Sequence, residues 1–187
     1  RDDVTYTDGT KMTAHDVVYT FKKYYEAGIM FTKYLDFDKF VAEDDYTLTI
    51  KYFQYIPGWQ FDLTEHGIFN ESIVEAAGGL EAFVHNPTVT SGKYKLVEWK
   101  TGQHVLLERN ENYWDKDYVG YYKYIKFIPI ADAASRVMAV QSGEADIAAQ
   151  LSVAQAVALE NDPSVEGKMF SIGTTYNLYF NCDEGIF

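Results

Sequence analysis

Cysteine is nearly absent from this 187-residue sequence, which contains only Cys182. A single thiol cannot close an intrachain disulfide and cannot build a metal site alone. Basic residues are also scarce, since 16 lysines and arginines stand against 28 acidic side chains, a net charge of −12. Nucleic acids and anionic membranes attract basic surfaces, so we expect neither as a partner. No apolar run approaches the 18 residues that a membrane-spanning helix needs.

What the sequence has in abundance is tyrosine, with 16 residues in an aromatic fraction of 17%. Hydrophobic residues make up 47% and charged residues 24%, which is typical of a globular protein. Tyrosine combines an apolar ring with a hydroxyl, so it suits half-buried sheets and hydrated binding surfaces. Packing on strands is the simpler explanation. The sequence starts without methionine or a signal peptide, so we expect a piece of a longer chain.

Two capping boxes predict helix starts. Thr13 is followed three residues later by Asp16, and apolar residues at helical spacing follow as far as Tyr25. Ser72 and Glu75 form the second box, which predicts a short helix that ends at Gly78. Further helices are predicted over 80–85, 132–142 and 152–160.

Alternating residues predict strands, and a proline suggests a boundary. Hairpins are predicted over 37–43 with 46–53 and over 93–99 with 104–109, followed by strands at 124–130, 168–172 and 176–181. Because Pro87 disfavours helix at Asn86, we expect residues 1–87 to form a small α/β subdomain and 88–187 part of a main domain. Interleaved strands and helices indicate an α/β fold with a mixed sheet.

Local motifs indicate no chemistry. The sequence contains no Gly-x-Ser-x-Gly nucleophile turn and no phosphate-binding loop. Its four histidines are scattered, with no pair at i, i+4 and no cysteine cluster. We therefore expect no catalytic residue, metal site or cofactor, which favours a binding function over an enzyme.

Several segments together resemble family 5 of the extracytoplasmic solute-binding proteins, which deliver peptides, nickel chelates or sugars to ABC permeases. They occur in the family's order over nearly the whole chain: DGTKMTAHDVVYTF at 8–21, DDYTLTI at 44–50, SGKYKLVEW at 91–99, LERNENYW at 107–114, PIAD at 129–132, QSGEADI at 141–147 and YFN at 179–181.

The resemblance implies a periplasmic-binding-protein-like type II lobe, a mixed sheet with flanking helices, that is truncated and lacks its second lobe. In this family two lobes close over a solute, and closure is set by contacts made only in the closed state. Implied partners are a peptide or another small solute and the permease subunits in the membrane. The resemblance also implies an extracytoplasmic location, in the periplasm or on the cell surface with a lipid anchor. The piece could self-associate through apolar surface that the missing parts would cover.

The resemblance also implies a set of residues near the cleft. Phe31 and Tyr34 follow the first helix, and Thr90, Ser91 and Gly92 line the crossing between domains. Gln150 lies after the Asp146–Ile147 strand, and Tyr179 and Asn181 lie near the hinge. Plain packing is the alternative role for each. The family's usual Gly-Thr-Gly-Pro-Tyr is replaced by Val89-Thr90-Ser91-Gly92-Lys93-Tyr94, which loses the rigidity of the proline.

Two other functions stay open at this point. The chain could be a surface receptor or interaction domain without a transport role, which differs from an importer component only in its partners. A hydrolase on a similar scaffold is disfavoured by the missing nucleophile motifs. Peptide is the favoured solute over nickel chelates and sugars, and the four histidines give nickel no support.

Overall fold

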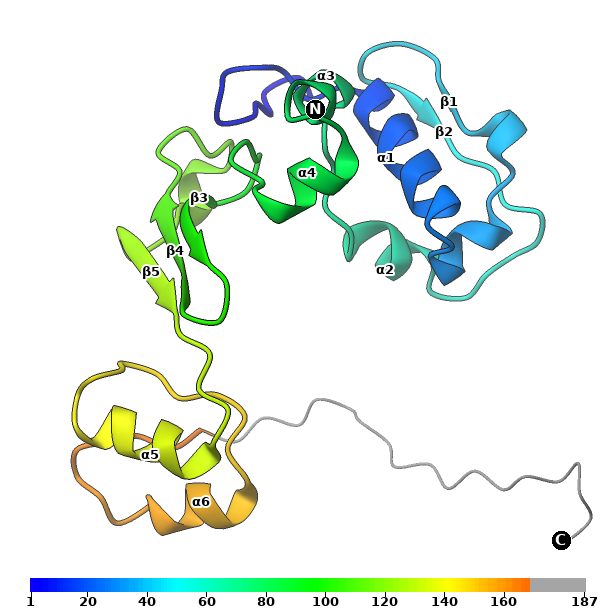
Figure 1. Cartoon of the computed structure of the whole chain (residues 1–187). Helices are drawn as coiled ribbons and strands as arrows, with labels where there is room; N and C mark the ends of the chain where they lie inside the picture. The colour runs from blue at the N-terminus through cyan, green and yellow to red at the C-terminus, as the bar shows by residue number, and fades with distance from the viewer. Residues whose placement is uncertain (169–187) are drawn as a thin grey trace, which may run out of the picture. The chain divides into compact units, whose positions relative to one another are not determined.

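The structure is a computed structural model in which residues 1–168 are described, apart from the side chains of Met30 and Phe31. The chain divides into two compact units, Arg1–Ile128 and Pro129–Phe187 (Figure 1). Tyr179, Asn181 and the two predicted C-terminal strands lie outside the described residues, except for Lys168. Within residues 1–168, every helix is too short or too polar to cross a bilayer.

The first helix, α1, covers Ala14–Glu26 and begins as the sequence predicts. Thr13 is its N-cap, and the Asp16 carboxylate accepts a hydrogen bond from the Thr13 backbone N–H at 2.8 Å. The buried face of α1 carries Phe21, whose ring stacks on Phe40 with centroids 5.3 Å apart. Leu35 completes this core, which the partly buried residues Val17 and Val18 and several later side chains surround.

Between α1 and the first sheet, the chain forms two short 3₁₀ helices, η1 over Met30–Tyr34 and η2 over Phe37–Lys39. Strands β1 (Val41–Ala42) and β2 (Leu48–Thr49) then pair antiparallel. The predicted hairpin over 37–43 and 46–53 is therefore present but much shorter than expected. A 3₁₀ helix has three residues per turn, so Phe37 and Phe40 lie on one side of the backbone. Both pack on the core there, which explains why the first arm does not begin as a strand.

Three short helices follow: α2 over Trp59–Thr64, α3 over Glu71–Ala76 and α4 over Leu80–His85. The sequence did not predict α2. The predicted start of α3 was wrong, because Asn70 is the N-cap and its side-chain oxygen accepts from the Ile73 N–H at 3.2 Å. Ser72 lies inside the first turn of α3. Figure 1 shows α1, α3 and α4 next to one another in the first unit.

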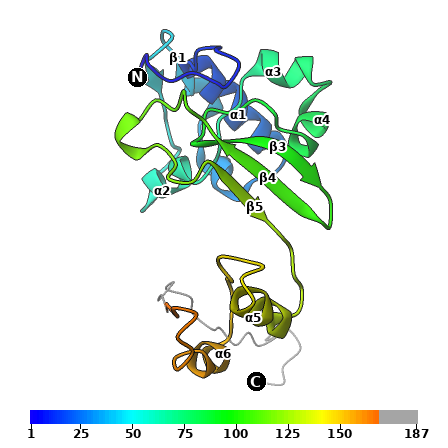
Figure 2. The same cartoon turned by 90° about the vertical axis from the view of Figure 1, so that its left-hand side faces the viewer.

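A three-stranded antiparallel sheet completes the first unit, with strand order β3-β4-β5 (Figure 2). Its strands are β3 (Tyr94–Lys100), β4 (His104–Arg109) and β5 (Tyr124–Phe127), close to the predicted bounds. The β3–β4 register shifts between Leu96 and Glu98. A third 3₁₀ helix, η3 (Lys116–Tyr118), lies in the connection from β4 to β5. Every strand pair within residues 1–168 is antiparallel, whereas we expected a mixed sheet.

The second unit contains α5 (Ala133–Gln141) and α6 (Val153–Ala158), both at predicted positions. Asp132 and Ser152 cap them, and each side chain accepts from a backbone N–H three residues later. The predicted boundary after residue 87 falls inside the first unit. Thr7 and Thr90 bond across it, with the Thr7 N–H donating to the Thr90 carbonyl at 2.8 Å. A separate subdomain over 1–87 stays a prediction.

Candidate functional site

The segment 90–92 is held by polar groups on both sides. The Thr90 N–H donates to the Thr7 hydroxyl at 3.2 Å, and the Thr90 hydroxyl accepts from the Gly92 N–H at 3.2 Å. Asn110, which is only 4% exposed, donates its amide to the Gly92 carbonyl at 2.9 Å. Ser91 and Gly92 are half-buried. The segment is therefore a fixed backbone crossing despite lacking the proline.

An open apolar hollow of about 360 Å³ lies beside Thr90 on the sheet. Strands β3 and β4 supply most of its lining, which consists of Pro87, Thr90, Tyr94, Leu96, Trp99, Val105 and Leu107. Because the residues alternate in direction along a strand, Leu96 of β3 and Leu107 of β4 face the same side when paired in register. The hollow can accept apolar groups, but its lining offers few polar groups to orient a ligand.

A loop rich in tyrosine is bonded to Tyr94, which lines this hollow, and sequence reasoning did not assign the loop a role. We name residues 118–124 the tyrosine loop. Its rings are exposed, with Tyr118 at 66%, Tyr121 at 88% and Tyr122 at 59%. Exposed tyrosines offer flat apolar faces and hydroxyls, which suit stacking and hydrogen bonding to a solute. The signal in the sequence was the cluster DYVGYYKY at 117–124.

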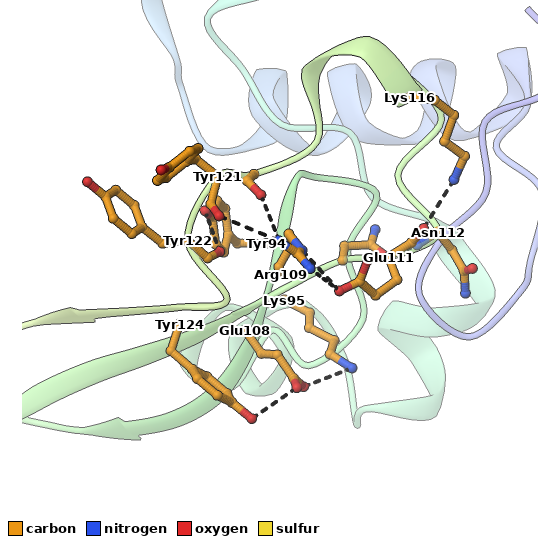
Figure 3. A network of polar contacts seen from close by, with 12 residues as sticks. Tyr94, Lys95, Glu108, Arg109, Glu111, Asn112, Lys116, Tyr121, Tyr122 and Tyr124 are labelled. Carbon is orange, nitrogen blue, oxygen red and sulfur yellow. Dashed lines mark hydrogen bonds and ion pairs between the residues drawn. The ribbon is translucent and has the colours of Figure 1, made fainter.

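Arg109 and Tyr94 fix the tyrosine loop from the sheet (Figure 3). Arg109 donates Nε and Nη2 to the Glu111 carboxylate at 2.9 and 2.8 Å and Nη1 to the Gly120 carbonyl at 3.3 Å. The Tyr94 hydroxyl donates to the Tyr122 carbonyl at 2.9 Å. Gly120 is buried under the Tyr94 ring, where a Cβ would lie 2.5 Å from ring atoms. The loop therefore presents its tyrosines from a defined backbone.

The predicted residues Phe31 and Tyr34 belong to η1, beyond the C-terminal end of α1. Tyr34 is half-buried, its carbonyl accepts from the Phe53 N–H at 3.0 Å, and the Lys33 ammonium lies 4.9 Å from its ring centroid. Thr90 instead bonds to Thr7, in the turn that precedes α1. A helix of 13 residues is about 20 Å long. The structure therefore places these two predicted groups near opposite ends of α1 and does not bring them together.

Gln150 lies in the second unit, in the connection between α5 and α6. Its backbone has φ of 58°, and its side chain is exposed. Gln150 therefore forms a candidate group of its own within the second unit. Tyr179 and Asn181 stay predictions because they lie outside the described residues.

Neighbouring cations and hydrogen-bond donors explain why the pKa is lowered for two carboxyl groups of the β3–β5 sheet. A hydrogen bond from Lys100, followed by one from His104, lowers the pKa of Glu98. A hydrogen bond from Lys95 lowers the pKa of Glu108, to which the Tyr124 hydroxyl also donates (Figure 3). Each carboxyl is paired within the sheet, so none is arranged as an acid–base pair. Among residues 1–168, no cluster of three or more His, Cys, Asp or Glu side chains could hold a metal.

Comparison with known proteins identifies the class of molecule to which this arrangement belongs. The sequence matches the family described as bacterial extracellular solute-binding proteins, family 5 Middle, over residues 1–187. The chain belongs to this family, as the ordered segments predicted.

Relatives and solved structures agree with this assignment. The probable D,D-dipeptide-binding periplasmic protein DdpA of Escherichia coli is 29% identical over 190 residues, covering 97% of this chain and 36% of DdpA. The periplasmic oligopeptide-binding protein OppA of Salmonella typhimurium is 26% identical over 170 residues, covering 79% of this chain and 31% of OppA. The chain thus spans about a third of the length of these relatives.

Two solved structures share the fold. NikZ from Campylobacter jejuni, in complex with Ni(L-His), has a TM-score of 0.74 at 23% identity, covering 87% of this chain and 33% of NikZ. Listeria monocytogenes OppA bound to peptide has a TM-score of 0.72 at 20% identity, covering 87% of this chain and 36% of that OppA. These likenesses confirm the predicted fold class.

Proposed function

We propose that this chain is part of the substrate-binding component of an ABC importer, which captures peptides outside the cytoplasm and delivers them to a membrane permease. The observation that carries the proposal is the family match over residues 1–187. The peptide class is supported by the names of the relatives OppA and DdpA, which are described as oligopeptide-binding and D,D-dipeptide-binding.

The shape of the candidate site supports a role as one wall of a binding cleft. The hollow beside Thr90 is apolar and open to solvent, and the tyrosine loop is exposed. Ligand sites that bind tightly usually bury most of the ligand surface. Since the relatives are about three times as long as this chain, a second wall would come from other parts of the whole protein. Closure of the two walls would then favour the ligand-bound state.

Binding without chemistry is part of the proposal. The carboxyl groups of the sheet are occupied in ion pairs, and the described histidines form no cluster with other titratable groups that could hold a metal. A captured peptide should therefore leave the protein intact. Apolar side chains at the surface, such as Phe53 and Ile147, also make self-association of the isolated chain an expected outcome.

The test is a binding experiment on the 187-residue chain, with Salmonella OppA as the positive control. Saturation-transfer NMR with a tripeptide library detects weak complexes, and mass spectrometry afterwards shows whether the peptides are intact. We expect uncleaved tripeptides to bind with Kd weaker than about 1 μM, because one wall buries only part of the ligand.

Three results would contradict the proposal. The first is that no tripeptide binds the chain at millimolar concentration while OppA binds a tripeptide in the same mixture. The second is that the peptides are cleaved. Sub-micromolar binding would contradict the two-wall arrangement. Ni(L-His) in a parallel sample serves as the competing solute, and binding of this chelate alone would replace peptide as the cargo.

A further inference from the structure

Gln150 has an unusual backbone for its residue type. Its φ of 58° lies in the left-handed region, and within residues 1–168 it is the one residue other than glycine with positive φ. This region is unfavourable for a residue with a Cβ, and such conformations persist only where the surroundings hold them. Glycine or asparagine would adopt it more easily. The sequence has glutamine here, so the side chain itself needs an explanation.

Within residues 1–168, the Gln150 side chain is not part of a packed core. It is exposed, and within residues 1–168 its amide forms no hydrogen bond. A primary amide carries two N–H donors and a carbonyl acceptor. These groups complement the C=O and N–H of a peptide unit, which is the ligand class of the proposed function.

Arg136 on α5 holds the Gln150 backbone. Its Nη2 donates to the Gln150 carbonyl at 3.1 Å, while Nη1 donates to the carbonyls of Ile130 at 2.7 Å and Ala131 at 3.0 Å. Its Nε is buried and has no partner within residues 1–168. One rigid, planar cation therefore ties the segment before α5 to the segment before α6. Lysine could not reproduce this fork, because its ammonium is a single flexible donor group.

We propose that Arg136 is a positioning residue that keeps Gln150 in the left-handed conformation and so presents its free amide to the backbone of a bound peptide. This inference rests on the proposed function, in that the ligand is a peptide. Arg136 itself does not touch the ligand. The role of the guanidinium is to compensate an unfavourable backbone by three hydrogen bonds to carbonyls.

The experiment compares the 187-residue chain with its Arg136→Lys, Gln150→Ala, Gln150→Gly and Arg136→Lys/Gln150→Gly variants. The one-bond Cα–Hα coupling at residue 150 reports the sign of φ by NMR, and amide exchange over 146–152 reports local stability. Trialanine is the ligand probe, and its binding is followed by saturation transfer to its methyl protons, which can be read in every variant. Arg109→Lys is the matched control, since Arg109 also binds backbone carbonyls but lies in the other unit.

We expect Arg136→Lys to move Gln150 out of the left-handed region, to raise amide exchange over 146–152, and to weaken trialanine binding about tenfold. Gln150→Ala should weaken binding by a similar factor without changing amide exchange as much. In the double variant glycine accepts positive φ without help, so protection from exchange should return while binding stays weak. Arg109→Lys should leave the coupling at Gln150 unchanged.

An unchanged coupling at Gln150 in Arg136→Lys would overturn the positioning role. A changed coupling with undiminished trialanine affinity would overturn the link between position and ligand. If trialanine does not bind even the unaltered chain, the peptide function fails. The coupling and the exchange rates then decide by themselves whether Arg136 positions Gln150.

Discussion

The Asp16 carboxylate joins the starts of two helices, and this junction allows a quantitative test. Asp16 is 4% exposed and accepts from the Thr13 N–H at 2.8 Å and from the Asn70 side-chain amide at 2.6 Å. Asn70 in turn caps α3 through Ile73. The contact between Asn70 and Asp16 spans 54 residues, so it ties α3 to α1.

Replacing Asn70 by alanine removes both interactions at once. Loss of an N-cap costs about 1 kcal/mol. Loss of a hydrogen bond to a buried charged group costs about 1.5–3 kcal/mol, because the carboxylate is left with fewer donors. We therefore expect Asn70→Ala to lower the free energy of unfolding of the first unit by about 3 kcal/mol.

Urea unfolding followed by tryptophan fluorescence measures this change selectively. All three tryptophans, Trp59, Trp99 and Trp114, lie in the unit Arg1–Ile128, so the signal reports that unit. With an m-value of about 2 kcal/mol/M, the midpoint should fall by about 1.5 M.

Ser72→Ala is the matched control for the cap. Ser72 is exposed and lies within the first turn of α3, where alanine is a better helix former. Its midpoint should change by less than about 0.3 M, given an effect below about 0.5 kcal/mol. The reasoning would be refuted if Ser72→Ala cost as much as Asn70→Ala, since the cap would then be the serine that the sequence pattern favoured.

Three further outcomes follow from buried groups in the first unit. Burial raises the pKa of Asp16 and outweighs the hydrogen bonds that lower it, so the folded state binds this proton more tightly than the unfolded chain. The difference in unfolding free energy between the unaltered chain and the Asp16→Asn variant should therefore fall as the pH rises from about 3.8 through the raised pKa of Asp16, and then stay level. Urea titrations in which this difference rises over the same pH range would contradict the predicted sign. Gly120→Ala should destabilise the unit by about 1–3 kcal/mol through the clash with Tyr94, and Tyr94→Leu should relieve part of that loss in a double-mutant thermal melt. Tyr6→Phe should raise the unfolding free energy by about 1 kcal/mol, because the buried Tyr6 hydroxyl has no partner within residues 1–168, and a lower midpoint would indicate a bond to it.

Within residues 1–168, local patterns predicted most of the α-helices and the β3–β4–β5 sheet, and the reasons are local too. The box from Thr13 to Asp16 and the apolar spacing behind it are contained within one helix, so α1 begins where expected. The β3–β4 hairpin likewise depends on neighbouring residues, since its turn at 101–103 contains Gly102 in the left-handed region. The prediction of where α3 begins was wrong because both Asn70 and Ser72 are residue types that cap helices well. The choice between them is made by Asp16, which is distant in sequence.

The candidate site was harder to predict because its loops are positioned by single polar side chains from distant elements. Arg109 at the end of β4 fixes the tyrosine loop, and Arg136 on α5 fixes Gln150. In both cases a guanidinium binds backbone carbonyls, so the loop sequence carries no trace of the partner that shapes it. A glycine can signal positive φ, but glutamine cannot.

An arginine at the end of a strand or within a short helix, next to a connection rich in polar or aromatic residues, has five donors and few local acceptors. When no carboxylate lies at helical or cross-strand spacing to satisfy all of them, backbone carbonyls of the following loop are the available acceptors. Asp132 lies four residues before Arg136, but its carboxylate bonds to Ser135, and the hydrogen bonds of Arg136 within residues 1–168 all go to backbone carbonyls. Such an arginine therefore predicts a loop of fixed conformation, and the exposed side chains of that loop become the first candidates for ligand contact.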